Sequence, residues 1–220
     1  MNTKRAKVCS PVSLSKRKLG RVTEAELYDG VIVNGTSDFA FVVECLRRHE
    51  AGWCVIGGLA VNVYTAPIYT ADLDLVVVAA EREPVLADLR AAEFRIKEFE
   101  FSINAKRRAG PGGRTDSLLM VQFTKVERYQ AFIPRASLRT LFGLDVPVAA
   151  LADVVQGKLW AWSDPTRRPT KQLKDKLDLL RLAEAYPAEV EPLLPEPLQT
   201  EAVANRLKRP NQEDGWGDED

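Results

Sequence analysis

Residues 53–78, WCVIGGLAVNVYTAPIYTADLDLVVV, form the stretch that decides the fold. It opens with a short apolar strand, breaks at Gly57 and Gly58, continues with residues that suit one or two helical turns, and re-enters a strand after Pro67. Side chains alternate along a strand, so Asp72 and Asp74 face one way and the apolar residues face the other. The sequence therefore predicts two carboxylates about 7 Å apart on one face of a buried strand.

This pair of aspartates needs a positively charged partner. Two adjacent buried carboxylates repel each other, and an unpaired one is costly to bury. Mg²⁺ meets that need with few protein ligands, because one or two carboxylates and substrate phosphates commonly hold it. The paired glycines permit close backbone approach, and the helix that starts there offers free N–H groups to a phosphate. The 13 residues between Gly58 and Asp72 suffice for a helix that runs away and a loop that returns, which predicts a phosphate site beside the carboxylates.

Overall composition is that of an ordinary globular protein. The 220 residues are 45% apolar and 28% charged, and the formal net charge is zero, so any affinity for nucleic acid or membrane has to be local. Residues 1–22 hold seven Lys or Arg and no acid, whereas the last nine hold five acids and no base. We expect a basic, flexible arm over 1–35 and an acidic tail over 209–220. Solvated ends and a basic arm that contacts RNA are both consistent with these runs.

Cysteine and histidine usage restricts the chemistry. Cys9, Cys45 and Cys54 have no metal-type spacing, the N-terminus has no signal-peptide core, and no run of 18 apolar residues exists. We therefore expect a reduced, cytoplasmic protein that does not enter a membrane. The only histidine, His49, follows a helical segment and is expected to be solvated. Any chemistry then depends on carboxylates, Lys and Arg.

The remaining pattern predicts an α+β fold, a small mixed sheet flanked by helices with a C-terminal helical appendage. We place the core at 36–150 and the helical part at 151–208. Helices are expected over 36–52, 82–93, 150–163 and 170–187, with a further turn or two within 193–209, and strands over 94–103, 117–126 and 144–149. A basic glycine-rich loop is expected at 105–116.

Three motifs in this order carry a resemblance to a known family. GGLAVNVY…PIYTADLDLVV is similar to the opening motif of the nucleotidyltransferase-fold (DNA polymerase β-like) superfamily. LADVVQGKLWAW and RRPTKQLKDKLDLLRL resemble the C-terminal helices of the AbiEii type IV toxin group within the minimal members of that superfamily. The resemblance covers about residues 36–186.

The resemblance implies a role for each motif residue. It assigns the nucleotide site to Gly57, Gly58, Thr70 and Lys158, Mg²⁺ or Mn²⁺ to Asp72 and Asp74, and catalysis to Asp72, Asp74, Lys158 and Asp175. Many members carry a third acid on a neighbouring strand, but the strand SLLMVQFT here offers only the amide Gln122. We therefore predict that Asp175 reaches the cleft in its place. The competing interpretation is that Asp175 and Asp178 simply pair with nearby Lys or Arg.

The implied activity is transfer of a nucleoside monophosphate from an NTP to an acceptor hydroxyl. We hypothesise a tRNA acceptor, to which the basic arm and the loop would supply phosphate contacts. The AbiEii resemblance implies a toxin with a cognate antitoxin. The loop cations are Lys106, Arg107, Arg108 and Arg114. The alternative is a non-catalytic nucleotide-binding or regulatory member, which the missing strand acid favours. Lys158 lies on an apolar helix face and needs an anion; if that anion is phosphate, Lys158→Met is expected not to destabilise the fold. Trp160 and Trp162 suit a packed helix interface better than a base-stacking surface.

Overall fold

The computed structural model describes residues 35–107 and 119–208. The predicted basic arm up to residue 34, the acidic tail 209–220, and the loop residues Arg108, Arg114 and Asp116 lie outside these ranges. The N-terminal half comprises α2 (Gly35–Arg48), β1 (Trp53–Ile56), α3 (Gly57–Tyr64), β2 (Asp72–Val77), η1 (Ala79–Glu81), α4 (Arg82–Ala91), β3 (Phe94–Glu98) and β4 (Ser102–Arg107). The rest comprises β5 (Met120–Thr124), η2 (Glu127–Arg135), β6 (Ser137–Leu141), β7 (Leu144–Val148), α5 (Leu151–Trp162), α6 (Pro169–Ala185), α7 (Pro187–Val190), η3 (Glu191–Leu193) and α8 (Glu196–Lys208).

The strands form one seven-stranded mixed sheet in the order β3-β4-β5-β2-β1-β7-β6. Strand β2 lies at the centre, antiparallel to β1 and parallel to β5, and β1 is parallel to β7. The two edges are antiparallel pairs, β3 with β4 and β6 with β7. This central position explains why β2 is apolar on the face opposite its aspartates: Leu73 and Leu75 are fully buried.

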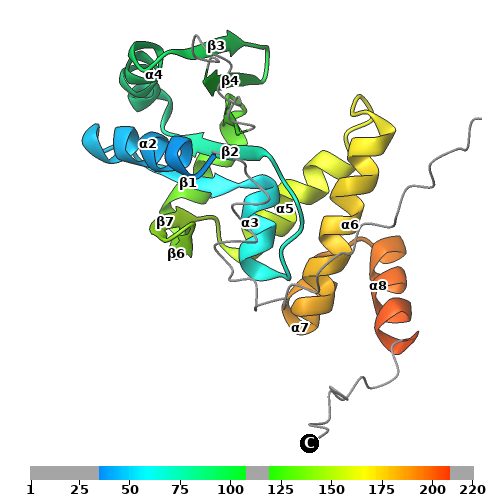
Figure 1. The fold of residues 1–220 in the computed structure, drawn as a ribbon. Coiled ribbons are helices and arrows are strands. Elements are labelled where there is room, and N and C mark those ends of the chain that lie inside the picture. Colours follow the sequence, from blue (N-terminus) through cyan, green and yellow to red (C-terminus); the bar gives the residue numbers. More distant parts are fainter. Residues whose placement is uncertain (1–34, 108–118, 209–220) are drawn as a thin grey trace, which may run out of the picture.

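Helices cover both faces of the sheet. Figure 1 shows α2 and α4 together on one side of β1 and β2, and the C-terminal helices α5 to α8 gathered on the other. Helix α2 buries Phe39, Val42, Val43 and Leu46, the apolar period expected from the sequence. Helix α3 packs between the sheet and the helices α5 and α6, so the glycine pair lies where the two parts of the chain meet.

The predicted fold class, a mixed sheet flanked by helices with a C-terminal helical part, is confirmed. Three elements differ from expectation. The single strand expected over 94–103 is a hairpin, β3 and β4, because the amide of Phe99 donates to the carbonyl of Ser102 and turns the chain. Strand β6 was missed, since its SLRTL sequence is largely polar and exposed. Helix α8 has 13 residues rather than one or two turns.

Among residues 35–107 and 119–208, none of the helices has the length and apolar character that crossing a bilayer requires.

Candidate functional site

The loop between α3 and β2 is fixed so that Thr70 returns to Gly58. Asn62 donates from Nδ2 to the carbonyl of Ile68 at 2.7 Å, and its Oδ1 accepts from the Ile68 amide at 3.2 Å. Arg181 on α6 holds the same loop by donating to Thr65 Oγ1 at 2.7 Å. A Cβ placed on Gly58 would lie 3.1 Å from Thr70 Oγ1. The predicted return of the chain to the glycine pair is therefore observed, with Thr70 buried beside it.

Position 57 requires a glycine, because its backbone lies against the side chain of Asp74. Its φ is +69°, a conformation that L side chains rarely adopt, and a Cβ there would overlap the Asp74 carboxylate. The register of β1 and β2 explains this proximity, because Ile56, the residue before Gly57, pairs with Asp74. The start of α3 and the second aspartate therefore touch, as the sequence predicted for a phosphate site beside the carboxylates.

Gly57→Ala is expected to destabilise the protein more than Gly143→Ala and to displace Asp74. Gly143 is the matched control, because its φ is +76° but a Cβ there would meet nothing within 4 Å. The control bears only backbone strain of about 1–2 kcal/mol, whereas Gly57→Ala adds the overlap with Asp74. Urea unfolding of both variants checks this. Equal losses of stability would contradict the close contact.

The aspartate pair has the predicted arrangement on β2. Asp72 and Asp74 are partly exposed on the face opposite buried Leu73 and Leu75. The pKa of Asp74 is raised to about 6 by burial and by the neighbouring charge of Asp72, although Lys158, Lys174 and Lys171 oppose the shift. Gln122 on β5 pairs directly with Asp74. An amide thus stands beside the pair on the adjacent strand.

This pKa gives the metal-free protein a specific pH dependence. The folded state favours protonated Asp74, whereas an unfolded Asp titrates near pH 3.9, so ionising Asp74 weakens the fold as pH rises from about 4 to about 6. Below about pH 4, Asp74 does not lower the free energy of unfolding. Above about pH 6, it lowers the free energy of unfolding by up to about 3 kcal/mol. In EDTA, we expect Asp74→Asn to be stabilising relative to wild type at pH 7.5 and to lose that advantage at pH 4. Urea titrations at the two pH values measure this, and a difference independent of pH would contradict the raised pKa.

Lys158 on α5 is held by two carboxylates of α6. Its Nζ lies 3.1 Å from Asp175 Oδ1 and 2.6 Å from Asp178 Oδ2, and all three residues are buried. Burial opposes the Lys158 charge, but Asp178 and Asp175 outweigh it and raise the pKa. Arg167 donates to the other oxygen of Asp175 at 2.6 Å. The sequence correctly indicated that this ammonium needs an anion, and the described residues supply two.

Asp175 lines the same pockets as Asp74, whereas Asp178 pairs with Lys158 and Arg181 away from both. Both Asp175 oxygens are in ion pairs, one with Lys158 and one with Arg167. Each oxygen keeps a further lone pair, so these ion pairs lower the basicity of Asp175 but do not by themselves prevent it from binding a metal ion. Its assignment as the substitute for the absent strand acid stays a prediction.

A pocket of about 260 Å³ is lined by Gly58 and Thr70 and by the two aspartates of β2, Asp72 and Asp74. Its remaining lining is strongly basic, and comprises Lys158, Arg167, Arg168, Lys171 and Lys174, with Gln122 and Asp175. Within the described chain, no carboxylate forms an ion pair with Arg168, Lys171 or Lys174. Three cations that form no ion pair, beside two carboxylates, suit a polyphosphate that carries a divalent cation.

These three cations, the basic wall of the pocket, were not predicted from the sequence. The signal was present in RRPTKQLKDK, where Lys171, Lys174 and Asp175 recur at helical spacing. The sequence assigned the triphosphate contact to Lys158 and the phosphate contacts of an RNA acceptor to a loop expected at 105–116. Lys106 and Arg107 instead end β4, because the strand continues through them. Arg107 donates to Asp38 and lies over the rings of Phe41 and Phe94, so it braces α2 against the sheet edge.

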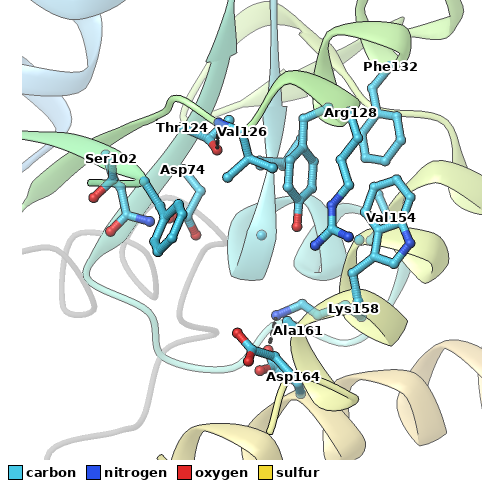
Figure 2. Close-up of a pocket in the computed structure, with 18 of the residues that line it drawn as sticks. Asp74, Ser102, Thr124, Val126, Arg128, Phe132, Val154, Lys158, Ala161 and Asp164 are labelled. Atoms are coloured by element: carbon cyan, nitrogen blue, oxygen red, sulfur yellow. Dashed lines mark hydrogen bonds and ion pairs between the residues drawn. The ribbon is translucent and has the colours of Figure 1, made fainter. Parts of the chain in front are cut away.

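A larger pocket of about 530 Å³ continues from the basic one. Five residues line both, Asp74, Gln122, Lys158, Arg167 and Asp175. Figure 2 shows Asp74 and Ser102 on one wall, Arg128 and Phe132 on the opposite wall, and Lys158 at the base between them. The site is therefore one continuous depression between the sheet, η2 and the helices α5 and α6.

The donors at the aspartate pair fit a divalent cation of the Mg²⁺ type. The described residues contain no group of three or more His, Cys, Asp or Glu that could form a complete protein cage. Mg²⁺ does not need one, because it retains water and substrate phosphates as ligands. Asp72 and Asp74 on one face, with an elevated Asp74 pKa and phosphate-suited cations opposite, match that requirement.

Together these features define a mixed-sheet protein with a carboxylate pair facing a basic pocket. No protein-family model matches the chain, and no curated protein matches it. Among solved structures, similar folds include ANT(2″)-Ia in complex with adenylyl-2″-tobramycin (TM-score 0.49, 13% identity, 77% of this chain and 97% of that one). The lincosamide antibiotic adenylyltransferase LnuA has a TM-score of 0.46 at 10% identity over 66% of this chain and 96% of that one. An antigenic nucleotidyltransferase-like protein from Paracoccidioides brasiliensis has a TM-score of 0.48 at 18% identity over 77% and 85%. These neighbours are nucleotidyltransferase-fold proteins. The assignment of this chain to the nucleotidyltransferase superfamily, and to its AbiEii group, stays a prediction.

Proposed function

We propose that this protein is a metal-dependent nucleotidyltransferase that moves a nucleoside monophosphate from an NTP to an acceptor hydroxyl. One observation carries the proposal: Asp72 and Asp74 share a pocket with the start of α3 and with three cations that form no ion pair among the described residues. A triphosphate with its divalent cation supplies the missing charges on both sides.

Different residues of the pocket are assigned to different parts of the NTP. Arg168, Lys171 and Lys174 face the β- and γ-phosphates, which leave as pyrophosphate, and Gly58 lets the backbone approach them. Asp72 and Asp74 would hold Mg²⁺ or Mn²⁺ at the α-phosphate. Bound there, the cation neutralises charge on the reacting phosphate and activates the acceptor oxygen. Lys158 and Arg167 fix Asp175 in the same cleft.

The reaction needs little further chemistry from the protein. The acceptor oxygen forms a bond to the α-phosphorus, and the bond to the bridging oxygen breaks, so that its electron pair leaves with pyrophosphate. The proton of the acceptor hydroxyl passes to solvent. Phosphoryl transfer is catalysed mainly by positioning and charge stabilisation. The amide Gln122 beside Asp74 is therefore compatible with activity, although many members of the resembled superfamily have an acid on that strand.

Lys171 and Lys174 are expected to contribute to the affinity for the phosphates. Lys171→Ala with Lys174→Ala should weaken binding of inorganic tripolyphosphate by about tenfold or more, since each lost phosphate contact is charge-assisted. Lys176→Ala on the same helix is the control, because Lys176 pairs with Glu201 and lines neither pocket. Isothermal titration calorimetry measures the affinities. Equal effects of the paired variant and the control would remove the phosphate role from this wall.

The direct test supplies each α-³²P-labelled NTP with Mg²⁺ and total tRNA. Label on RNA establishes the enzyme and identifies the acceptor, and label on protein identifies a different one. Tight NTP binding with no transfer to any acceptor favours the alternative, a nucleotide-binding or regulatory member. That alternative rests on the missing strand acid at Gln122.

The tRNA acceptor and the toxin role are the finer parts of this proposal. The tRNA acceptor rests on the basic residues of the sequence, and the toxin role rests on the sequence resemblance. Expression in a bacterial host tests the toxin role: growth arrest by the wild type and growth with Asp74→Asn would support it. Normal growth with the wild type at equal protein level contradicts it, and rescue by a neighbouring gene would identify the antitoxin.

A further inference from the structure

The larger pocket contains an aromatic wall that phosphate binding does not use. Phe132 on η2 and Trp160 on α5 are stacked, with ring centroids 5.7 Å apart and planes 7° apart. Tyr129 meets the Trp160 ring edge-on at 5.3 Å. The Arg128 guanidinium lies over the indole at 4.3 Å from its centroid. Figure 2 shows Arg128 and Phe132 projecting on the same side of the pocket.

The backbone is adapted to this wall. Gly157 lies in the middle of α5, where glycine costs about 1 kcal/mol relative to alanine. A Cβ at Gly157 would lie 3.3 Å from Tyr129 Cε1 and 3.6 Å from Phe132 Cε2. The absence of a side chain therefore allows α5 to approach the rings of η2 closely. Trp160 thus belongs to a packed interface, as the sequence favoured, and also lines the pocket.

Arg128 forms no ion pair with a carboxylate of the described residues. Asp153 is held by Arg135, and Asp164 accepts hydrogen bonds from Thr166 that lower its pKa, with smaller contributions from the charges of Arg167 and Arg128. Asp175 is bound by Lys158 and Arg167. An exposed guanidinium that lies on an indole suits a further flat π-system, because Arg stacks on aromatic faces.

We propose that the base of the donor nucleotide stacks on the Arg128–Trp160 wall while its triphosphate occupies the basic pocket. This inference rests on the proposed function. The two pockets meet at Asp74, so an α-phosphate held there directs the nucleoside into the larger one. Its volume of about 530 Å³ lies within the range typical of small-molecule sites. Stacking accepts any base, so the wall supplies affinity and orientation.

Calorimetry with five ligands tests the inference separately from the proposed function. ATP, GTP, CTP, UTP and inorganic tripolyphosphate are titrated with Mg²⁺ and without acceptor. We expect at least one NTP to bind the wild type about tenfold or more tightly than tripolyphosphate, as a base–aromatic contact provides. Arg128→Ala and Trp160→Leu should remove that advantage and leave tripolyphosphate affinity within about twofold.

Arg139→Ala on β6 is the matched control. Its guanidinium also lies over an aromatic ring, 6.0 Å from the centroid of Tyr64, but Arg139 lines neither pocket. Tripolyphosphate binding with no gain for any NTP overturns the stacking inference and leaves the phosphate site intact. An unchanged NTP affinity in Arg128→Ala also overturns it, and this exposed residue can be replaced without unfolding. Absence of binding by all five ligands overturns the proposed function together with the inference.

Discussion

Asp74→Asn is expected to lower NTP-dependent transfer by at least about a thousandfold and to leave the fold intact. Loss of one preorganised charged group in a phosphoryl-transfer site typically costs two to three orders of magnitude, and loss of the cation costs more. Asparagine has the same shape, so Gly57 still fits against it. The variant also relieves repulsion from Asp72, which should stabilise the metal-free protein. Asp72→Asn is expected to act in the same direction.

Asp145→Asn is the control for this experiment. Asp145 is also a strand residue, on β7, where it accepts a hydrogen bond from Thr140 at 2.7 Å and lines neither pocket. Initial rates at several Mg²⁺ concentrations, together with the unfolding midpoint of each variant, separate catalysis from stability. Full activity in Asp74→Asn would show that the carboxylate pair is not the reaction centre.

Lys158→Met is expected to destabilise the protein by about 3–5 kcal/mol, because it leaves Asp175 and Asp178 buried without their shared cation. The sequence alone led to the opposite expectation, that the stability would be unchanged. The structure reverses it, since the ammonium is bound by carboxylates of the chain. The Asp178 Oδ2 atom has no other polar partner among the described residues.

Urea unfolding with two comparisons checks this prediction. Lys176→Met removes a cation from the exposed pair with Glu201 and should cost at most about 1 kcal/mol. The triple variant Lys158→Met, Asp175→Asn, Asp178→Asn should recover only part of the stability lost by Lys158→Met alone. The two buried carboxylates are then neutral, but Arg167 and Arg181 lose their charged partners. A small loss for Lys158→Met would show that the three charges do not form a structural unit.

The local pattern of residues 53–78 was sufficient to predict the central elements. A glycine break between an apolar strand and a helix, followed by alternating acids, admits few backbone arrangements. The observed contact of Gly57 with Asp74 and of Gly58 with Thr70 follows from that pattern. The hairpin of β3 and β4 was not predictable in the same way, because its turn at 99–101 is formed by Phe, Glu and Phe rather than by glycine or asparagine.

The candidate site likewise has a part that was predictable from the sequence and a part that was not. The sequence by itself determined which residues form the carboxylate pair, and that they share one face, because side-chain alternation along a strand is a local property. Only the tertiary structure decided that α6 turns Lys171 and Lys174 toward that pair and turns Asp175 and Asp178 onto Lys158. Helical spacing places these residues on neighbouring positions but does not specify the partner. The packing of α5 against α6 determines which charged side chains pair, because a charge buried on one helix needs an opposite charge from the other.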